Sequence, residues 1–473
     1  MPAITILWVI YGWYLIDSKV FIVIASFSVK KRLCMYEIVV GRDEDDRRAF
    51  GDKGTFLLGK HYVKMGQTTS LSTGIYMDVL RSHIVSIFGK RGSGKSFSLG
   101  SIAEGMMTLS SDLTQNLSLV LFDTMGIFWT MKYENKRDEA LLKEWNLPFQ
   151  RFNVLVYAPF GSFSDYKGRG IPIDLPFSIS PAELSAGDWC NIFEVESTSP
   201  FGTLLGRVIS VLRRQQPSFS IQDIIRTVTK DERTKDDVKA AVENMFSSAE
   251  EWGLFNEKST PISELAVGGQ ITVLDLSPYA VSGVKSNIRA LVISIVSKKL
   301  FNERMMVRKA EELSSIKQTT SFSRKPVGDK KEMPLVWLFL DEAHEFLPKE
   351  GVTPASNALI TILREGRQPG ISLVLASQQP GQIHTDVMTQ SDIVVSHSVT
   401  AKIDVDALGA LMQSYMREGL DKSLNDLPRI KGAALLFDDT NERLYPMRVR
   451  PRITWHGGSS PSLVAEAKGI LEF

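Results

Sequence analysis

Short runs of apolar residues recur along the chain from residue 83 onward, each long enough for one buried strand. Eight runs stand out: 83–89 (HIVSIFG), 117–123 (LSLVLFD), 154–159 (VLVYAP), 271–277 (ITVLDLS), 334–342 (PLVWLFLDE), 371–378 (ISLVLASQ), 393–398 (IVVSHS) and 433–438 (AALLFD). Between them lie stretches with helical spacing of apolar positions. Strands that are apolar on both faces and alternate with helices are typical of a mostly parallel sheet. The sequence therefore predicts one large α/β core.

Three other parts of the chain depart from this alternation. Residues 35–80 hold short strand-like pieces between turn signals and predict a small β-rich N-terminal module. Residues 180–264 carry apolar positions at helical spacing and predict an inserted helical subdomain. Residues 304–333 are polar, charged and interrupted by Pro326, which favours a flexible surface loop. Residues 456–473 remain as a C-terminal tail.

Composition narrows the class of protein. The chain has 473 residues, 43% of them hydrophobic, and its 55 basic and 54 acidic residues leave a net charge of +1. It therefore has no global basic field, and contacts with nucleic acid would have to come from local residues. Only two cysteines occur, Cys34 and Cys190, too few for a disulfide framework. We expect an intracellular, cytoplasmic protein in a reducing compartment.

Residues 1–34 form an apolar leader. The uncharged run Ala3–Ile16 has 14 residues, about 21 Å as a helix, which is shorter than a hydrocarbon core of about 30 Å. A longer span would place Asp17 and Lys19 within the membrane. We hypothesise that Met35 is the natural start and that the leader is upstream sequence translated by mistake. A membrane-associated N-terminus is the alternative.

A glycine-rich stretch follows the first predicted core strand. Residues 89–96 (GKRGSGKS) match the pattern G-x-x-x-x-G-K-[ST], with a buried strand before them and a helical stretch after them. In that setting backbone N–H groups cradle phosphates, Lys95 reaches the β and γ phosphates, and the Ser96 hydroxyl ligates Mg²⁺. A glycine-rich turn without a ligand is the alternative. We expect nine residues to bind the nucleotide: Gly89, Lys90, Arg91, Gly92, Ser93, Gly94, Lys95, Ser96 and Phe97.

A nucleotide site that hydrolyses also needs an acid at the end of another buried strand. Six apolar residues, 335–340, lead directly into Asp341 and Glu342. We expect Asp341 to hold the magnesium shell and Glu342 to orient and deprotonate the attacking water. Two solvated strand-end carboxylates are the alternative, although ionised groups beside an apolar strand are costly without compensation. Asp123, at the end of another predicted strand, is a further candidate for the site, with a turn-forming aspartate as its alternative.

The order of these motifs resembles a known family. The stretches FGKRGSGKS, VLFDTMG, WLFLDEAHEFL and LITILREGRQPGISLVLASQQPGQI lie within residues 81–449 and are similar to the HerA group of ring ATPases, relatives of the FtsK DNA pumps. The resemblance implies a RecA-like ATPase domain over residues 81–455, with ATP and Mg²⁺ as cofactors. It also implies a hexamer around duplex DNA and a partnership with a NurA-type nuclease.

Matching positions add further candidates to the site. The resemblance implies that Gln378 senses the γ-phosphate, that Arg364 or Arg367 acts on the nucleotide of the neighbouring subunit, and that Arg81 lies near the subunit boundary. An arginine from a neighbour stabilises charge on the transferring phosphoryl group, so hydrolysis would depend on assembly. A head-to-tail contact of this kind can close into a ring. A helix-surface charge pair and a strand cap are the respective alternatives for the two arginines and Gln378.

Two features depart from the family pattern. Gln379 stands where many relatives have an arginine, and residues 35–79 are shorter than the β-barrel that helps better-studied members to assemble and to dock a nuclease. Ring pumps need basic or polar loops in the channel, for which 309–331 and 382–392 are candidates. Solvated loops without a ligand are the alternative for both segments.

The sequence thus predicts a Mg²⁺-dependent ATPase that translocates DNA as a hexamer, in DNA processing or repair. Two other readings stay open. A membrane-associated conjugation or secretion ATPase would have a genuine N-terminal anchor. A regulatory ATP switch within a defence complex would hydrolyse slowly and would not translocate.

Overall fold

The computed structural model describes residues 37–458, apart from 66–67, 281–283, 321–332, 400, 411–419, 421–422 and 425. The leader 1–34 and most of the tail 456–473 lie outside the described residues, so the expectations for them stay predictions. Within the described residues, no helix is both long and apolar enough to cross a membrane.

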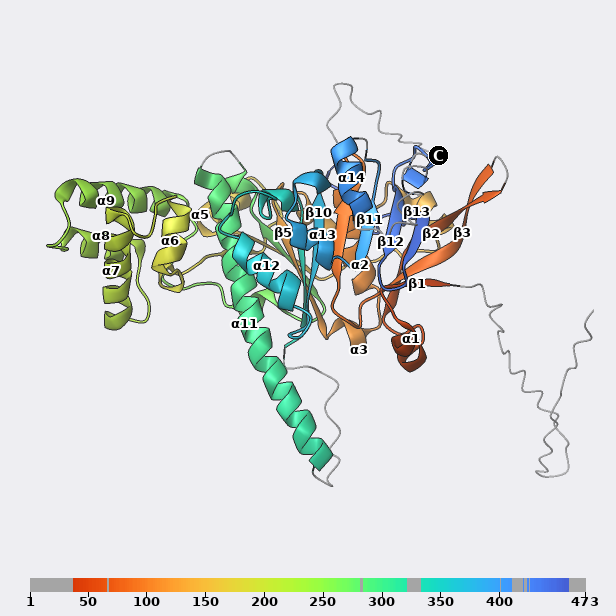
Figure 1. The fold of residues 1–473 in the computed structure, drawn as a ribbon, viewed down its shortest axis with the longest axis horizontal. Coiled ribbons are helices and arrows are strands. Elements are labelled where there is room, and N and C mark those ends of the chain that lie inside the picture. The colour runs from red at the N-terminus through yellow and green to blue at the C-terminus, as the bar shows by residue number, and fades with distance from the viewer. Residues whose placement is uncertain are drawn as a thin grey trace, which may run out of the picture. The chain divides into compact units, whose positions relative to one another are not determined.

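A 13-stranded sheet runs through the described part of the chain (Figure 1). Its strands are β1 (Ile38–Val40), β2 (Thr55–Met65), β3 (Thr68–Asp78), β4 (Ile84–Phe88), β5 (Leu117–Asp123), β6 (Val154–Pro159), β7 (Leu175–Phe177), β8 (Gln270–Asp275), β9 (Leu335–Leu340), β10 (Ile371–Ser377), β11 (Ile393–Ser396), β12 (Ala433–Asp438) and β13 (Arg443–Val449). Their order across the sheet is β1-β3-β2-β13-β12-β11-β4-β10-β9-β5-β8-β6-β7. Neighbours from β11 to β7 pair in parallel. The predicted α/β fold is confirmed, and each of the eight predicted core strands is present.

Helices cover both faces of this sheet. They are α1 (Glu44–Phe50), α2 (Lys95–Met107), α3 (Ser111–Thr114), α4 (Glu139–Glu144), α5 (Phe160–Gly168), α6 (Ala186–Ile192), α7 (Pro200–Gln215), α8 (Ile221–Thr229), α9 (Asp236–Glu251), α10 (Ile262–Leu265), α11 (Val284–Thr320), α12 (Ser356–Glu365), α13 (Thr385–Gln390) and α14 (Lys402–Ala410). Short 3-10 helices lie at η1 (Phe128–Lys132), η2 (Pro181–Glu183), η3 (Ser277–Tyr279), η4 (Ala343–Glu345) and η5 (Pro380–Gln382).

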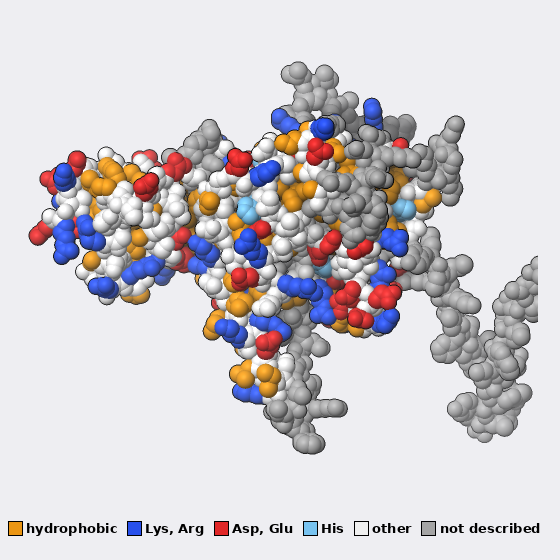
Figure 2. Space-filling view, viewed as in Figure 1, with side chains coloured by type: hydrophobic (Ala, Val, Ile, Leu, Met, Phe, Trp, Pro, Cys, Tyr) orange, Lys and Arg blue, Asp and Glu red, His pale blue; other side chains and the backbone are white. Residues whose placement is uncertain are grey.

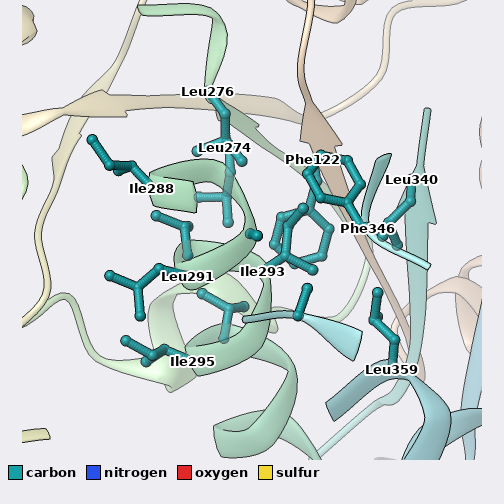
Figure 3. Packing of buried hydrophobic residues seen from close by; sticks show 14 of the residues in the cluster. Phe122, Leu274, Leu276, Ile288, Leu291, Ile293, Ile295, Leu340, Phe346 and Leu359 are labelled. Atoms are coloured by element: carbon teal, nitrogen blue, oxygen red, sulfur yellow. The ribbon is translucent and has the colours of Figure 1, made fainter. Parts of the chain in front are cut away.

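Alternate residues of the central strands point to opposite faces of the sheet, and both faces are buried. On β9, Leu338 and Leu340 belong to one apolar cluster, whereas Trp337 and Phe339 belong to the other. The first cluster packs α11 and α12 against the sheet and contains Phe122 (Figure 3). The second packs α2 against the opposite face. Burial on both faces explains why these strands are continuous apolar runs.

The N-terminal strands do not form a module of their own. The expected strands are present, but β2 pairs with β13, so that β1, β3 and β2 extend the main sheet at one edge. The charged stretch 42–54, one of the segments between the predicted strand-like pieces, contains α1. The Asp43 carboxylate caps this helix by accepting the N–H of Asp46. An acidic first turn and a basic last turn complement the helix dipole and stabilise a helix that has no apolar face.

The stretch 180–264 contains helices α6 to α10. Ser199 caps the start of α7, and a capping box between Ser220 and Asp223 starts α8. Apolar side chains of these helices pack on one another, with the ring of Phe246 4.8 Å from that of Trp189. Figure 1 draws α6 to α9 gathered at one side of the sheet. The bounds of a separate helical subdomain stay a prediction.

Part of the segment 304–333 is helix, not the flexible loop that the sequence predicted. Helix α11 continues to Thr320, and residues 321–332 lie outside the described residues. Its charged residues pair along the helix, as Arg308 does with Glu312 one turn later. The prediction was wrong for 304–320 because polarity suggested disorder, although Arg, Lys, Glu and Met are strong helix formers that gain from such pairs.

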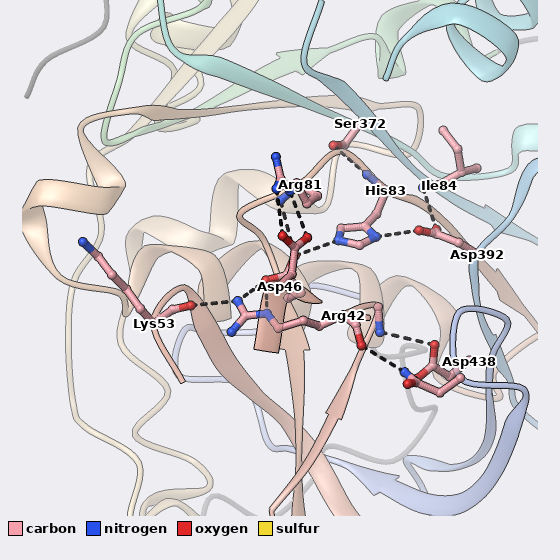
Figure 4. A network of polar contacts seen from close by, with 12 residues as sticks. Arg42, Asp46, Lys53, Arg81, His83, Ile84, Ser372, Asp392 and Asp438 are labelled. Atoms are coloured by element: carbon pink, nitrogen blue, oxygen red, sulfur yellow. Dashed lines mark hydrogen bonds and ion pairs between the residues drawn. The ribbon is translucent and has the colours of Figure 1, made fainter. Parts of the chain in front are cut away.

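A buried polar network surrounds the start of β4 (Figure 4). His83, which is 3% exposed, places Nε2 3.1 Å from Asp78 and Nδ1 2.5 Å from Asp392. Burial alone would lower the pKa of His83, but the two carboxylates outweigh burial and raise it to about 10. Arg42 donates to the other side of Asp78. A charged imidazolium therefore joins β3, β4 and the segment before β11.

We expect His83→Gln to lower the free energy of unfolding by about 3 kcal/mol, because it leaves two buried carboxylates without the cation between them. The pKa of His83 is raised on folding, so its contribution is complete below about pH 6.5 and is lost as the pH rises through about 10. Urea unfolding of both proteins at several pH values across this window checks the prediction. A difference in stability that stays constant or grows with pH would contradict it.

Candidate nucleotide-binding site

The carboxyl ends of β4, β10 and β9 are neighbours at one edge of the sheet and bring the predicted motif residues together. β4 leads into the loop 89–94, β10 into Gln378, and β9 into Asp341 and Glu342. Because parallel strands end at the same edge, side chains that are hundreds of residues apart in the chain meet there. The site is therefore a product of strand order.

The loop 89–94 turns tightly before α2. Gly94 precedes the first helical residue and has a backbone φ of 113°, a value that residues other than glycine rarely adopt. A Cβ at Gly89 would lie only 2.8 Å from the Cβ of His397. The start of α2, which is 13 residues long, leaves its first N–H groups without intrahelical acceptors. The loop and helix together offer a place for phosphate groups.

Lys95 and Ser96 stand at the start of α2 and face the acids of β9. Lys95 is 6% exposed, and burial lowers its pKa while Glu342 and Asp341 oppose that shift. The Ser96 hydroxyl donates to Asp341 Oδ2 at 2.5 Å. A hydroxyl and a carboxylate in contact are oxygen ligands of the type that Mg²⁺ prefers. Their placement fits the predicted metal-binding pair.

Glu342 has an unusual conformation and one unused oxygen. Its backbone lies at φ 52° and ψ 43°, which is rare for a residue with a side chain and is typical of functional sites. One carboxylate oxygen accepts from the Gln378 amide. The other is buried without a hydrogen-bond partner among the described residues, with Nδ1 of His344 3.6 Å away. Burial and the adjacent Asp341 raise the pKa of Glu342. A more basic carboxylate with one oxygen outside any hydrogen bond fits the deprotonation of a water.

These residues fit a magnesium nucleotide. The buried Ser93 hydroxyl and the second Glu342 oxygen lack hydrogen-bond partners among the described residues, so both can take a ligand atom or water. Among those residues no group of three His, Cys, Asp or Glu side chains could hold a metal alone. A Mg²⁺ ion at Ser96 and Asp341 would therefore take its other ligands from phosphate and water, as it commonly does in nucleotide sites.

Asp123 lies at the same edge of the sheet but is engaged by its own turn. It ends β5, three strands from β4, and accepts the N–H groups of Gly126 and Phe128 at 2.7 Å each. Burial raises the pKa of Asp123 to about 7, and Asp275, its register partner on β8, adds to the shift. The carboxylate shapes the turn after β5, and a contact with the nucleotide stays a prediction.

The three predicted subunit-boundary arginines lie away from the phosphate loop of their own chain. Arg81 precedes β4 and Arg367 precedes β10, so both are at the amino edge of the sheet, where they line a cavity of about 580 Å³. Arg81 donates twice to Asp46, at 2.7 and 2.9 Å. Arg364, which is exposed, donates to Asp386 at 2.7 Å. Their roles stay predictions.

The other predicted binding residues lie around the loop. Lys90 and Arg91 are exposed, and Phe97 is half-buried with its ring 5.4 Å from that of His456 in an edge-on contact. Contacts of these side chains with a nucleotide stay predictions.

Sequence reasoning missed the buried residues that anchor α2 to the C-terminal segment. Glu104 on α2 is fully buried, pairs with Arg452 and accepts the N–H of Ile453 at 2.7 Å. The partners are 348 residues apart in the chain. The only local signal is one acid within an apolar helix, which indicates that a buried partner must exist but not where it is.

Comparisons with known proteins agree with this geometry. The family model "Helicase HerA, central domain" matches residues 58–300. The probable DNA double-strand break repair helicase HerA of Methanocaldococcus jannaschii is 46% identical over 57 residues, 12% of this chain and 11% of that protein. The DNA double-strand break repair helicase HerA of Pyrococcus furiosus is 24% identical over 157 residues, 32% of this chain and 28% of that protein. The chain thus spans less than a third of either curated relative.

A solved structure supports the fold. VirB4 of Thermoanaerobacter pseudethanolicus has a TM-score of 0.50 at 11% identity, over 84% of this chain and 96% of that one. At this identity the likeness bears on the fold alone.

We expect Glu342→Gln to retain ATP binding and to lower kcat for ATP hydrolysis by about 10² to 10⁴-fold, because it keeps the shape of the side chain and removes the base. Phosphate release and equilibrium binding of a fluorescent ATP analogue check the two parts. Glu345→Gln is the matched control, since Glu345 pairs with Arg289 and should leave hydrolysis unchanged. Full hydrolysis by Glu342→Gln would rule out its role as the base.

Proposed function

The chain belongs to the family of the HerA helicase central domain, and from that membership and the site we propose that it is an ATP-driven DNA translocase. The family and the fold make it a P-loop ATPase. The observation that carries the proposal is the meeting of Lys95, Ser96, Asp341 and Glu342 at one sheet edge, in contacts that suit Mg²⁺ and an attacking water. Gln378 would sense the γ-phosphate through its bond to Glu342.

The residues proposed for the site lie at two opposite ends of the parallel strands. Lys95 and Glu342 lie at the carboxyl edge, whereas Arg81 and Arg367 lie at the amino edge of the same group of strands. A head-to-tail arrangement would set an arginine of one copy against the phosphate loop of the next, and such contacts can close into a ring. We propose the hexamer that the resemblance implies, with the ATPase domain over residues 81–455.

We propose duplex DNA as the substrate that is moved. Basic and acidic side chains are intermixed over the face seen in Figure 2, which agrees with the net charge of +1. DNA contacts would therefore come from local residues and from the channel of a ring. The segment 309–331, expected to be a channel loop, is helix up to Thr320, and 382–392 contains α13. Both segments stay candidates, as helix surfaces where they are described.

Partners and place in the cell are proposed with the family. The two curated HerA relatives carry DNA double-strand break repair in their names, and we propose a role in DNA processing in the cytoplasm, with a NurA-type nuclease as partner. The conjugation or secretion ATPase, which would move protein or transferred DNA, and the slow ATP switch remain the competing functions. A genuine N-terminal anchor would favour the first, and hydrolysis that does not depend on DNA would favour a protein substrate or the switch.

We expect duplex DNA to raise kcat for ATP hydrolysis by the full-length chain several-fold, because binding to the DNA phosphate backbone would be coupled to ATP turnover. Lys95→Ala is the blank and should have no measurable hydrolysis, because it removes the cation that would reach the β and γ phosphates. A coupled phosphate-release assay with and without DNA checks this. Hydrolysis that DNA does not change would favour a protein substrate or a switch and would contradict the translocase.

We expect Arg367→Ala to lower kcat by about 10³-fold or more if this arginine acts on the neighbouring subunit. Mixing inactive Arg367→Ala with inactive Lys95→Ala should then restore part of the activity, since one copy keeps the phosphate loop and the other keeps the arginine. The same mixing with Arg364→Ala tests the competing candidate. Failure of both mixtures to recover activity would contradict a site shared between copies.

A further inference from the structure

The segment after β11 continues the pairing of β11 with β4 into the phosphate loop. Within the strands Ser396 is the register partner of Phe88. Beyond the strand ends, the His397 N–H donates to the Phe88 carbonyl at 2.8 Å, and the Lys90 N–H donates to the Ser398 carbonyl at 3.1 Å. The last residue of β4 and the second residue of the loop are thus held by residues that are some 300 positions later in the chain.

The side chain of His397 lies beside both ends of the loop. It is fully buried. A Cβ at Gly89 would lie 2.8 Å from the Cβ of His397, and a Cβ at Gly94 would lie 3.7 Å from its Cε1. The His397 side chain therefore lies beside the first and the last glycine of the loop, with its Cβ near Gly89 and its ring near Gly94, and leaves no room for a side chain at Gly89.

Hydrogen bonds determine the tautomer of the His397 imidazole. Nδ1 lies 3.0 Å from the Ala433 carbonyl oxygen, which can only accept, so Nδ1 carries the proton. Nε2 then accepts from the Ser98 hydroxyl at 2.8 Å. Burial lowers the pKa of His397 to about 4, which the Ala433 carbonyl opposes and the charge of Lys95 reinforces. The neutral imidazole has a partner for each nitrogen.

We propose that His397 is a positioning residue of the nucleotide site, which holds the phosphate loop and the first turn of α2 in their binding geometry before the nucleotide arrives. The inference rests on the proposed ATP binding. Ser98 lies three residues after Lys95 and two after Ser96, so its bond to His397 fixes the rotation of α2 that aims both side chains. A loop that is already ordered avoids the entropic cost of ordering on binding. Its loss therefore raises the KM for ATP more than it lowers kcat.

A histidine that served only the core would behave differently. Its replacement would lower stability and the amount of folded protein, which reduces the measured rate in proportion and leaves KM unchanged. The other fully buried histidine at this strand, His83, lies at the opposite end of β4 and supplies the matched control. His83→Gln is expected to lower the melting temperature and to keep the KM for ATP.

The experiment measures KM and kcat for ATP hydrolysis, the Kd of a fluorescent ATP analogue and the melting temperature, all with the full-length chain. We expect His397→Leu, which fills the space without a polar group, to raise KM and Kd about tenfold with a smaller change in kcat. Ser98→Ala removes the same hydrogen bond from the other side and should raise KM in the same direction. His397→Gln, whose amide oxygen can accept from Ser98, should recover part of the affinity.

Unchanged KM and Kd in folded His397→Leu overturn the proposal. If His397→Leu does not fold, Ser98→Ala decides in its place, and an unchanged KM there has the same meaning. Wild-type protein that neither binds nor hydrolyses ATP overturns the proposed function together with this inference. Wild-type hydrolysis with normal KM in both variants overturns the inference alone.

Discussion

Everything at the proposed site depends on the register between β4, β10 and β9. Ser377 of β10 is level with Phe88 of β4, and Leu375 is level with Leu340 of β9, so the three strands deliver their next residues to one place. A slip of one residue would turn every side chain of a strand to the other face of the sheet. Each face is packed by its own apolar cluster. Such a slip would move every side chain into the cluster on the opposite face, where it would not fit its neighbours, so the packing specifies the register strongly.

Strand β4 connects the phosphate loop with the polar network around His83. It is five residues long, about 17 Å. The phosphate loop follows it, and the His83 network and Arg81 precede it. A buried histidine lies at each end of β4, and both of its ring nitrogens have polar partners. His83 at the amino end is charged, whereas His397 at the carboxyl end is neutral. The difference follows from the partners, since carboxylates stabilise the imidazolium, whereas a carbonyl and a hydroxyl suit the neutral ring.

The elements that sequence patterns missed are those in which charge, not apolar spacing, makes the helix. Helix α1 has no buried residue, and the end of α11 carries charged residues that pair with each other, so neither shows a clear apolar stripe. Capping by Asp43 and pairs such as Arg308 with Glu312 stabilise them locally. These signals are weak in a single sequence because the same residues are common in loops.

The sequence by itself determined the core strands and identified Lys95, Ser96, Asp341 and Glu342 as the candidate site, because apolar runs and motif spacing are local properties of the chain. Only the tertiary structure decided that the N-terminal strands join the main sheet. It also decided that Glu104 meets Arg452 and that His397 meets Ser98, over 348 and 299 residues. Such contacts follow from the order in which the strands pack, and no local pattern specifies that order.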